Sequence, residues 1–510
     1  MPIRTAAGLA LLALALVAGL VGDGLLRALP WGLNLGLWAG LLFLGILVIR
    51  RRLDVGPGAG RLAALSAALV FALLVAWRAS PTLALLDVGI MAVLGAAAAI
   101  QPAAKALRLA TVLDHLVGLV MATIYAAFGL VALVTVDIDW KAVPRDGWLR
   151  HLLAFARGLA IAVPLLIVFG ALFMAADAVF QGLVTKAFNI TPEEIVGHAL
   201  LFGALTWVLG GYLRGLGFGD EMATIQAVVD GSDANPPKRR PGLGVVEIAV
   251  VLGLLDVLFA AFVAVQFRYF FGGASLVEAT KSLTYADYAR HGFFELCTVA
   301  ALCLPMLLVG HWLFRPEKPA HHKVFNALAL VLVGLLAVIT VSGLMRMRLY
   351  THEYGLTELR LYTSVFMGWL ALIQVWFCVT VLPGRGDRFA FGALVAGLVA
   401  AGLLHVANPD ALIVRYNLVH GRTHHGADLD YVLGLSADAV PALLENWADV
   451  PEPARGRVAQ HLWINYHAKD APDWRTWNWS RSQARAAVQA QAAMLQPLAQ
   501  SFSIPPKVER

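Results

Sequence analysis

The chain has 510 residues, of which 59% are hydrophobic and 14% are charged, with a formal net charge of +6. A soluble protein carries about 25% charged residues, and its surface needs more polar cover than this chain can supply. The composition therefore excludes a soluble fold and predicts an integral membrane protein. The positive charge then reflects membrane topology, and no nucleic-acid partner is expected.

Apolar runs follow one another from the N-terminus. A helix that crosses the hydrocarbon core needs about 20 mostly apolar residues. We interpret the first run as a membrane helix rather than a signal peptide, because further runs follow it directly. We expect an all-α, polytopic transmembrane helical bundle of about 12 spans. The candidate spans are residues 6–21, 33–49, 62–77, 83–100, 116–136, 158–175, 196–213, 245–265, 292–313, 324–344, 361–382 and 389–406.

Basic residues in the short loops predict sidedness, because cytoplasmic loops are rich in Lys and Arg. They place the C-terminal tail outside the cytoplasm. The two halves of the chain conflict, because five candidate spans separate Arg61 from Lys238 and two cytoplasmic loops require an even number. We expect the fault in residues 103–136, a long stretch that begins amphipathic. The loop residues are Arg50, Arg51, Arg52 and Arg61, then Lys238, Arg239 and Arg240, then Arg315, Lys318 and Lys323, then Arg385 and Arg388.

Composition predicts transmembrane helices up to residue 406, which we divide into N-terminal helices in 1–156 and a core in 157–406, followed by a small soluble all-helical domain in 407–510. Short helical patterns in the last region cover 411–418, 437–447, 454–467 and 474–495. Its tryptophans are expected in the core of this domain, with docking on the membrane interface as the alternative. Trp474 and Trp477 would share a helix face. The tryptophans are Trp447, Trp463, Trp474, Trp477 and Trp479.

No cofactor or metal site is expected. The cysteines Cys297, Cys303 and Cys378 lie in apolar runs without the spacing of a zinc site, so we interpret them as buried small hydrophobes. His420 and His424 have the spacing of one helix turn, but the neighbouring glycines argue against a helix there. Polar loop histidines are therefore expected near the C-terminus. They are His405, His420, His424, His425, His461 and His467.

Ionisable residues within the spans are functional hypotheses, because a charge inside the bilayer is costly unless it is paired or hydrated. Asp256 lies near the middle of its span, and Glu247 points to the opposite helix face. Asp256 is either paired with an arginine or protonated and hydrogen-bonded; the alternative is an ion or proton site of a transporter. Asp87 and Asp177 lie toward span ends, where they could reach the interface. Other polar residues in spans are His198, Glu295 and Gln374.

A tyrosine-rich motif precedes the ninth candidate span. Tyr285, Tyr288 and Glu295 fall on one helical stripe, with Gly292 allowing close helix approach. Arg290 lies off the stripe and could pair with phospholipid or with an acid on another helix.

A second motif lies between the tenth and eleventh candidate spans. After Tyr354 and a glycine turn, Thr357 is a plausible N-cap and Glu358 lies at the positive end of the next helix. Arg346, Arg348 and Arg360 face the outside in the predicted topology, so they are expected to pair with Glu295 and Glu358. The alternative is a binding site for an anionic lipid headgroup or a small acid.

Both motifs resemble the signatures of a bacterial polytopic membrane family, a domain of unknown function of the 4153/4173 type. Residues 164–180, 408–417 and 429–443 are also similar to that family, so the resemblance runs from about Arg157 to Trp479. It implies a many-helix inner-membrane protein, and it supplies no catalytic residue to carry over to this sequence.

The sequence favours a non-enzymatic, multi-pass inner-membrane protein with a sensing, regulatory or scaffold role in the envelope. A transporter or channel for a small solute or lipid is the alternative, and a membrane-embedded transferase is less favoured. Expected partners are the lipid bilayer, anionic lipid headgroups, or an envelope protein that binds the C-terminal domain. Patterns for nucleotide hydrolysis, NAD chemistry or a redox relay do not occur in a suitable context.

Overall fold

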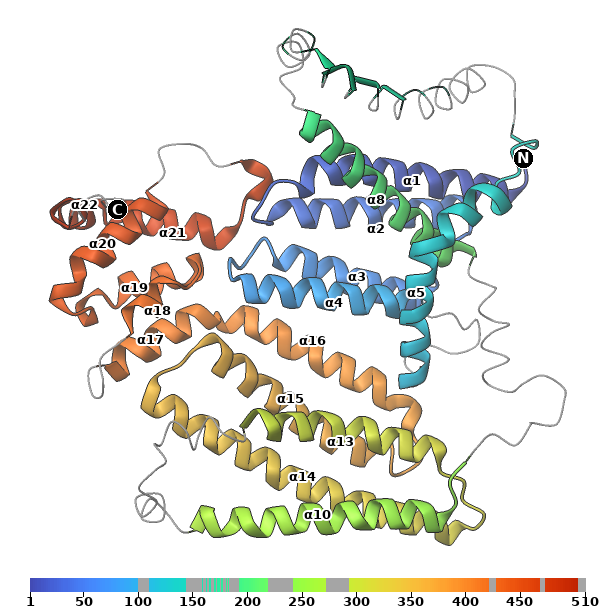
Figure 1. Ribbon diagram of the computed structural model, residues 1–510, viewed down its shortest axis with the longest axis vertical. Coiled ribbons are helices and arrows are strands. Elements are labelled where there is room, and N and C mark those ends of the chain that lie inside the picture. Colours follow the sequence, from blue (N-terminus) through green and yellow to red (C-terminus); the bar gives the residue numbers. More distant parts are fainter. Residues whose placement is uncertain are drawn as a thin grey trace.

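The computed structural model describes residues 1–99, 110–143, 192–218, 242–271, 293–421, 428–467 and 473–502, with single residues between 158 and 182. Two groups of long helices lie side by side, and shorter helices cover one end of them (Figure 1). The first group contains α1 (Ile3–Leu26), α2 (Leu33–Leu53), α3 (Ala59–Leu74), α4 (Pro81–Ala99), α5 (Val112–Ala132) and α8 (Pro192–Phe218).

The second group contains α10 (Val245–Phe271), α13 (Phe293–Leu313), α14 (Pro319–Tyr354), α15 (Glu358–Thr380) and α16 (Phe389–Ala407). Ten of the described helices have the length and apolar character of a membrane span, which confirms the multi-pass, all-α expectation. Two of the expected spans are not among the ten. Residues 62–77 correspond to α3, which has only 16 residues, and residues 158–175 lie largely outside the described part of the chain.

Each group has its own apolar core. Leu11, Leu94 and Leu213 belong to the core of the first group, and Leu307, Leu336 and Phe377 belong to that of the second. Helix α16 packs on α4 and thereby joins the two groups.

The N-terminal group depends on close backbone approach between α5 and α8. A Cβ atom added at Gly211 would lie 2.0 Å from the carbonyl oxygen of Tyr125, and one added at Gly129 would lie 2.7 Å from the carbonyl oxygen of Gly211. Small residues at such contacts let membrane helices pack closely. These two glycines therefore set the distance at which α5 crosses α8.

One end of the bundle carries the basic loops, and we call it the basic end. It holds the C-terminus of α2 with Arg50, Arg51 and Arg52. At this end the chain that follows α13 also pairs with the chain that precedes α10, because the backbone amide of Arg315 donates to the carbonyl of Leu243. The opposite end carries the turns that follow α1, α3, α14 and α16 (Figure 1).

Both ends of α5 lie at the basic end. The helix starts beside the beginning of α16 (Figure 1), which it contacts, and its first residue, Val112, packs against the apolar core of the second group. Its last turn runs into Asp137, which accepts hydrogen bonds from Arg4 (2.9 Å) at the start of α1 and Arg214 (2.6 Å) near the end of α8. Helix α5 accordingly runs crosswise to its neighbours (Figure 1). This is the stretch in which the conflict in sidedness was expected.

The C-terminal helices share a separate apolar cluster, which includes Val414, Leu443, Val458 and Val488. They are α17 (Pro409–Gly421), α18 (Leu429–Leu433), α19 (Val440–Glu445), α20 (Glu452–Tyr466), α21 (Trp479–Ala490) and α22 (Ala492–Ser501), with short 3-10 turns η4 (Ala437–Ala439), η5 (Trp447–Asp449) and η6 (Trp474–Thr476).

The tryptophans of this region fall into two sets. Trp447 and Trp463 pack against the C-terminal cluster, as expected. Trp474, Trp477 and Trp479 are exposed, so the expectation of a core position was wrong for them. Trp474 and Trp477 do not share a helix face either, because Trp474 lies in a 3-10 turn and Trp477 follows it with extended backbone. The chain is extended here because it binds the ends of α2 and α3, as described below.

Candidate functional site

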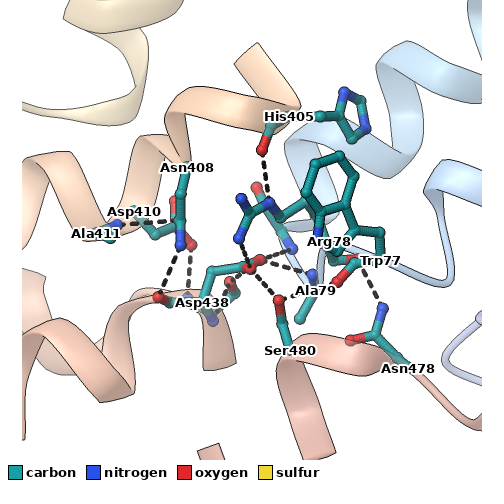
Figure 2. A network of polar contacts seen from close by, with 12 residues as sticks. Trp77, Arg78, Ala79, His405, Asn408, Asp410, Ala411, Asp438, Asn478 and Ser480 are labelled. Atoms are coloured by element: carbon teal, nitrogen blue, oxygen red, sulfur yellow. Dashed lines mark hydrogen bonds and ion pairs between the residues drawn. The ribbon is translucent and has the colours of Figure 1, made fainter. Parts of the chain in front are cut away.

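A buried polar cluster lies where the bundle meets the C-terminal helices, at the end opposite the basic loops (Figure 2). We call this cluster the junction. It joins the α3–α4 connection, the α14–α15 turn and the end of α16 to three segments of the C-terminal helices. Its residues are Arg78, Ala79, Ser80, Thr82, Asp87, Leu356, Glu358, His405, Asn408, Asp410, Asn417, Tyr431, Ser436, Asp438, Asn478 and Ser480.

Asp438 is the centre of the junction. Its position follows from local structure, because the Ser436 side chain accepts a hydrogen bond from the Asp438 amide and caps turn η4. One carboxylate oxygen accepts from the amides of Ala79 (2.6 Å) and Ser80 (2.9 Å) and from the Ser436 hydroxyl (3.2 Å). The other accepts from the Ser480 hydroxyl and from Arg78 Nη1 (3.4 Å). A single buried carboxylate thus joins three distant segments.

Arg78 supplies the positive charge nearest to Asp438. Its Nε donates to the carbonyl oxygen of His405 over 2.7 Å, at the last turn of α16. Its guanidinium also lies 4.7 Å from the centre of the Trp77 ring, at a distance where the cation interacts with the aromatic face. Arg78 therefore connects the Asp438 carboxylate to the end of a membrane helix.

His405 and Asp87 form a pair inside the bundle, both completely buried. His405 Nδ1 donates to the carbonyl oxygen of Ala401 (2.9 Å), because a carbonyl can only accept, and Nε2 lies 3.1 Å from Asp87 Oδ2. The second contact requires one proton, carried by either the imidazole or the carboxyl. The expectation of loop histidines was wrong for His405, and it was also wrong for His420 in α17 and His461 in α20. The expectation that Asp87 reaches the interface was wrong as well.

The α14–α15 turn joins the junction through its backbone. Gly355 has φ of 76°, and a Cβ there would lie 2.7 Å from Asn417 Oδ1, so a glycine fits both the conformation and the space. Asn417 accepts from the amide of Leu356 (2.6 Å) and donates to its carbonyl (2.8 Å). The amide of Glu358 donates to the hydroxyl of Tyr431 (2.7 Å).

The acidic side chains at this turn are bound by hydroxyl and amide groups. The Glu358 carboxylate accepts from Thr82 (3.0 Å) and Ser80 (3.4 Å). Asp410 is buried and accepts from the amide of Ser436 (3.1 Å), while its Oδ1 has no hydrogen-bond partner. Burial raises the pKa of the Asp410 carboxyl from 3.8 to about 6, and the charges of Glu358 and Asp438 add to this rise.

A short segment near the C-terminus closes the junction from the far side. Asn478 donates to the carbonyl oxygens of Val75 and Arg78, both over 2.8 Å. The amide of Trp479 donates to the carbonyl of Ala76 (2.7 Å). The backbone groups left free at the end of α3 are satisfied in this way, as helix termini require.

The polar network expected from the two motifs does not form a single cluster in the described part of the chain. Tyr285, Tyr288 and Arg290 lie outside the described residues, and Glu295 is exposed in the first turn of α13. Glu358 alone of the described members belongs to the junction. The expected pairing of Arg360 with an acid was wrong, because Arg360 Nη1 donates to the carbonyl of Tyr354 (3.0 Å) and its guanidinium stacks 3.9 Å from the centre of the Tyr350 ring.

The remaining members differ in their exposure. Arg348 and the Tyr354 side chain are exposed, and Arg346 is partly buried. Among the intramembrane acids, Asp177 is exposed and accepts from the amide of Phe180 (2.9 Å), and Glu247 is exposed in the first turn of α10.

Asp256 occupies the opposite face of α10 from Glu247. Its side chain is buried and neither carboxylate oxygen has a hydrogen-bond partner. Among the residues that the structure describes, neither the expected arginine partner nor the expected hydrogen bond of Asp256 is found.

Sequence reasoning missed most of the junction. Asp438, Arg78 and Asp410 were not singled out, although residues 408–417 and 429–443 had drawn attention as family-like segments. Their contacts join positions that are distant in sequence; Ala79 and Asp438, for example, are 359 residues apart. No local pattern reveals such a contact. Among the residues that the structure describes, no group of three His, Cys, Asp or Glu side chains is arranged to hold a metal ion.

The family model for the domain of unknown function DUF4153 matches residues 65–446. Because the match covers most of the chain, the protein belongs to this family. The expected limits of the likeness were wrong: the match begins in α3 rather than near Arg157, and it ends near Asn446 rather than at Trp479. Neither a curated protein nor a solved structure matches this chain.

Proposed function

We propose that this DUF4153 protein is a non-enzymatic inner-membrane protein that senses or regulates a property of the envelope. In this proposal the C-terminal helices form a domain (residues 407–510) outside the cytoplasm, and their state is transmitted to the membrane helices through the junction. The observation that carries the proposal is the Asp438 carboxylate, which binds the α3–α4 connection by two amides and one guanidinium while it lies in the C-terminal helices.

The proposed orientation rests on the basic end. Lys and Arg concentrate in cytoplasmic loops, so the basic end faces the cytoplasm and the C-terminal helices face away from it. A helix with both ends at the basic end does not cross the membrane. Of the five spans predicted between Arg61 and Lys238, removing α5 would leave four, an even number, and both halves of the chain would then agree.

A route for coupling runs from the C-terminal helices into the bundle. Asp438 binds Arg78, Arg78 binds the carbonyl of His405, and the His405 ring binds Asp87 on α4. A displacement of turn η4 would thus act on the ends of α4 and α16, the two helices that join the groups. Buried polar networks of this kind favour one arrangement over others, because a partly broken network leaves buried groups unpaired.

The same contacts argue against chemistry at the junction. General acid–base catalysis requires a group that can reach a bound substrate. The Asp87–His405 pair is completely buried, and the Asp438 carboxylate is occupied by protein donors on both oxygens. The Asp438 carboxylate and the Asp87–His405 pair therefore contact other protein groups, as in a structural coupling.

Complementation separates this proposal from its alternative. In a strain that lacks the chromosomal copy, we expect chains that lack residues 407–510, or that carry Asp438→Asn, to fail to restore the wild-type envelope phenotype. Asp256→Asn should restore it. The amount of each variant in the membrane fraction is measured, and Glu445→Gln, an exposed substitution in the same region, serves as the control.

The second candidate is a transporter or channel for a small solute or lipid, and Asp256 is the observation that favours it. A buried carboxyl without a hydrogen-bond partner inside a membrane helix is a functional hypothesis by default. The reverse complementation pattern, with loss of function in Asp256→Asn and none in Asp438→Asn, would support this candidate and reject the first.

A further inference from the structure

Exposed aromatic side chains gather beside the junction. Trp474 and Trp479 are 61% and 49% exposed, and Trp477 is 42% exposed. The α1–α2 connection adds the exposed side chains of Leu29 and Trp31. We call these five residues the tryptophan surface.

The backbone holds this surface at the level of the helix ends. The amide of Leu33, the first residue of α2, donates to the carbonyl of Trp477 (2.9 Å). A Cβ at Gly32 would lie 2.3 Å from that carbonyl oxygen, so the two chains are in direct backbone contact. Arg475 Nη1 donates to the carbonyl of Gly24 (2.5 Å), and Arg481 Nη2 donates to that of Trp31 (3.1 Å).

The level of these residues identifies their environment. α1 and α2 have the length and apolar character of membrane spans, so their ends lie where hydrocarbon gives way to headgroups. Tryptophan is enriched at this depth, because its ring is apolar and its indole N–H can bind headgroup or water oxygens. The same helices also carry exposed apolar side chains, such as Leu20 on α1 and Leu37 on α2.

We propose that the tryptophan surface inserts into the lipid headgroup region of the leaflet on the side of the C-terminal helices. The bilayer itself is then a direct partner of these helices, in addition to the membrane spans. This contact would fix the junction at a defined height above the hydrocarbon core, so that a change in the leaflet reaches Asp438 through residues 474–480.

The test places a fluorescent probe on the surface of the full chain. Cys297, Cys303 and Cys378 are replaced by alanine, and single cysteines are introduced as Trp474→Cys, Trp477→Cys and, as the matched control, Ile464→Cys. Ile464 is also exposed in the C-terminal helices, on α20. Each cysteine is labelled with an environment-sensitive dye, and the purified protein is reconstituted into phosphatidylcholine vesicles with or without a spin label near the headgroup end of the acyl chain.

We expect spin-labelled lipid to quench the dye at positions 474 and 477 and to leave the dye at 464 unchanged, while iodide in the buffer quenches 464 most strongly. Equal behaviour of all three positions would overturn the proposal. The same labelled proteins are also measured in native membranes. If iodide quenches the dye at 474 and 477 in vesicles but not in native membranes, a protein partner covers the surface, and the proposal is overturned as well. Gel filtration of each labelled variant confirms that it is folded, and the two surface positions test the proposal independently.

Discussion

Asp438 accepts more side-chain hydrogen bonds than any other described residue of the junction. Its carboxylate accepts from Ala79, Ser80 and Ser436 on one oxygen and from Ser480 and Arg78 on the other. Hydrogen bonds to an ionised acceptor are roughly twice as strong as those between neutral groups. Removing one partner of a buried ion pair also leaves the other charge uncompensated.

Asp438→Asn is therefore expected to lower the free energy of unfolding by about 3 kcal/mol, because Arg78 loses its buried counter-ion. Thermal unfolding of the detergent-solubilised protein measures the effect. Asp430→Asn is the control, since the Asp430–Arg457 pair is exposed on both sides, and such pairs contribute about 0–1 kcal/mol. Equal stability of the two variants would show that Asp438 does not hold the junction together.

Asp410 predicts a pH dependence of stability. Burial raises the pKa of its carboxyl from 3.8 to about 6, so the folded state binds the proton more tightly than the unfolded state does. The resulting stabilisation is complete below about pH 4 and is lost as pH rises through about 6. Ionised Asp410 then costs about 3 kcal/mol above that pH, since one pKa unit corresponds to about 1.4 kcal/mol.

Asp410→Asn removes this ionisation and retains an oxygen that can accept from Ser436. We expect the variant to be more stable than the wild type at pH 8, with a difference that shrinks toward pH 4. Unfolding midpoints across this range provide the measurement, with Glu445→Gln as a control that should shift neither end. A difference that does not change with pH would contradict the assignment.

At the scale of elements, the long helices were predictable and their connections were not. Span length and apolar composition identified α1, α2, α4 and α10 because both properties are local. The 474–495 segment was expected to be one helix, yet it forms η6, an extended stretch, α21 and α22. The extended stretch exists because the carbonyl of Trp477 and the amide of Trp479 bind α2 and the end of α3, and these contacts are distant in sequence.

The crossing of α5 and α8 yields a prediction with a matched control. Gly211→Ala should destabilise the protein, because the new methyl group would meet the backbone carbonyl of Tyr125 and force α5 away. Gly203→Ala lies in the same helix with open space around it, so its stability should be unchanged or slightly higher. Thermal unfolding in detergent decides between them, and similar midpoints would show that close helix approach is unimportant here.

The orientation of α5 can be tested from its flanking sequence. In a background without native cysteines, Thr111→Cys and Lys141→Cys should react with a membrane-impermeant maleimide from the same side, because both ends of α5 lie at the basic end (Figure 1). Labelling of the two positions from opposite sides would show that α5 crosses the bilayer, and the two halves of the chain would again disagree in sidedness.

At the scale of the whole molecule, composition was sufficient for the class of protein and insufficient for the site. The lipid environment requires apolar helices, and the apolar residues that form them are spread over the whole chain. The junction depends instead on a few pairs, such as Asp87 with His405, that are brought together only by the packing of α4 on α16. Glu358 was found in advance because the turn before α15 has its own local signature, in Gly355 and the N-cap Thr357.

The region that matches the family model includes only part of the junction. Asp438 and its partners in the α3–α4 connection lie inside the matched region, whereas Asn478 and Ser480 lie beyond it. The central contacts thus belong to the part of the chain that defines the family, and residues 474–480 extend them toward the tryptophan surface.

The position of the C-terminal helices relative to the basic end is the claim on which the sensing proposal depends. It is tested by single cysteines, Ile464→Cys in α20 and Lys318→Cys before α14, in a chain whose native cysteines are replaced by alanine. In intact cells whose inner membrane is sealed and whose outer envelope is permeabilised, we predict that an impermeant maleimide labels position 464 and reaches position 318 only after lysis. Labelling of 318 in sealed cells, with 464 protected until lysis, would contradict the account.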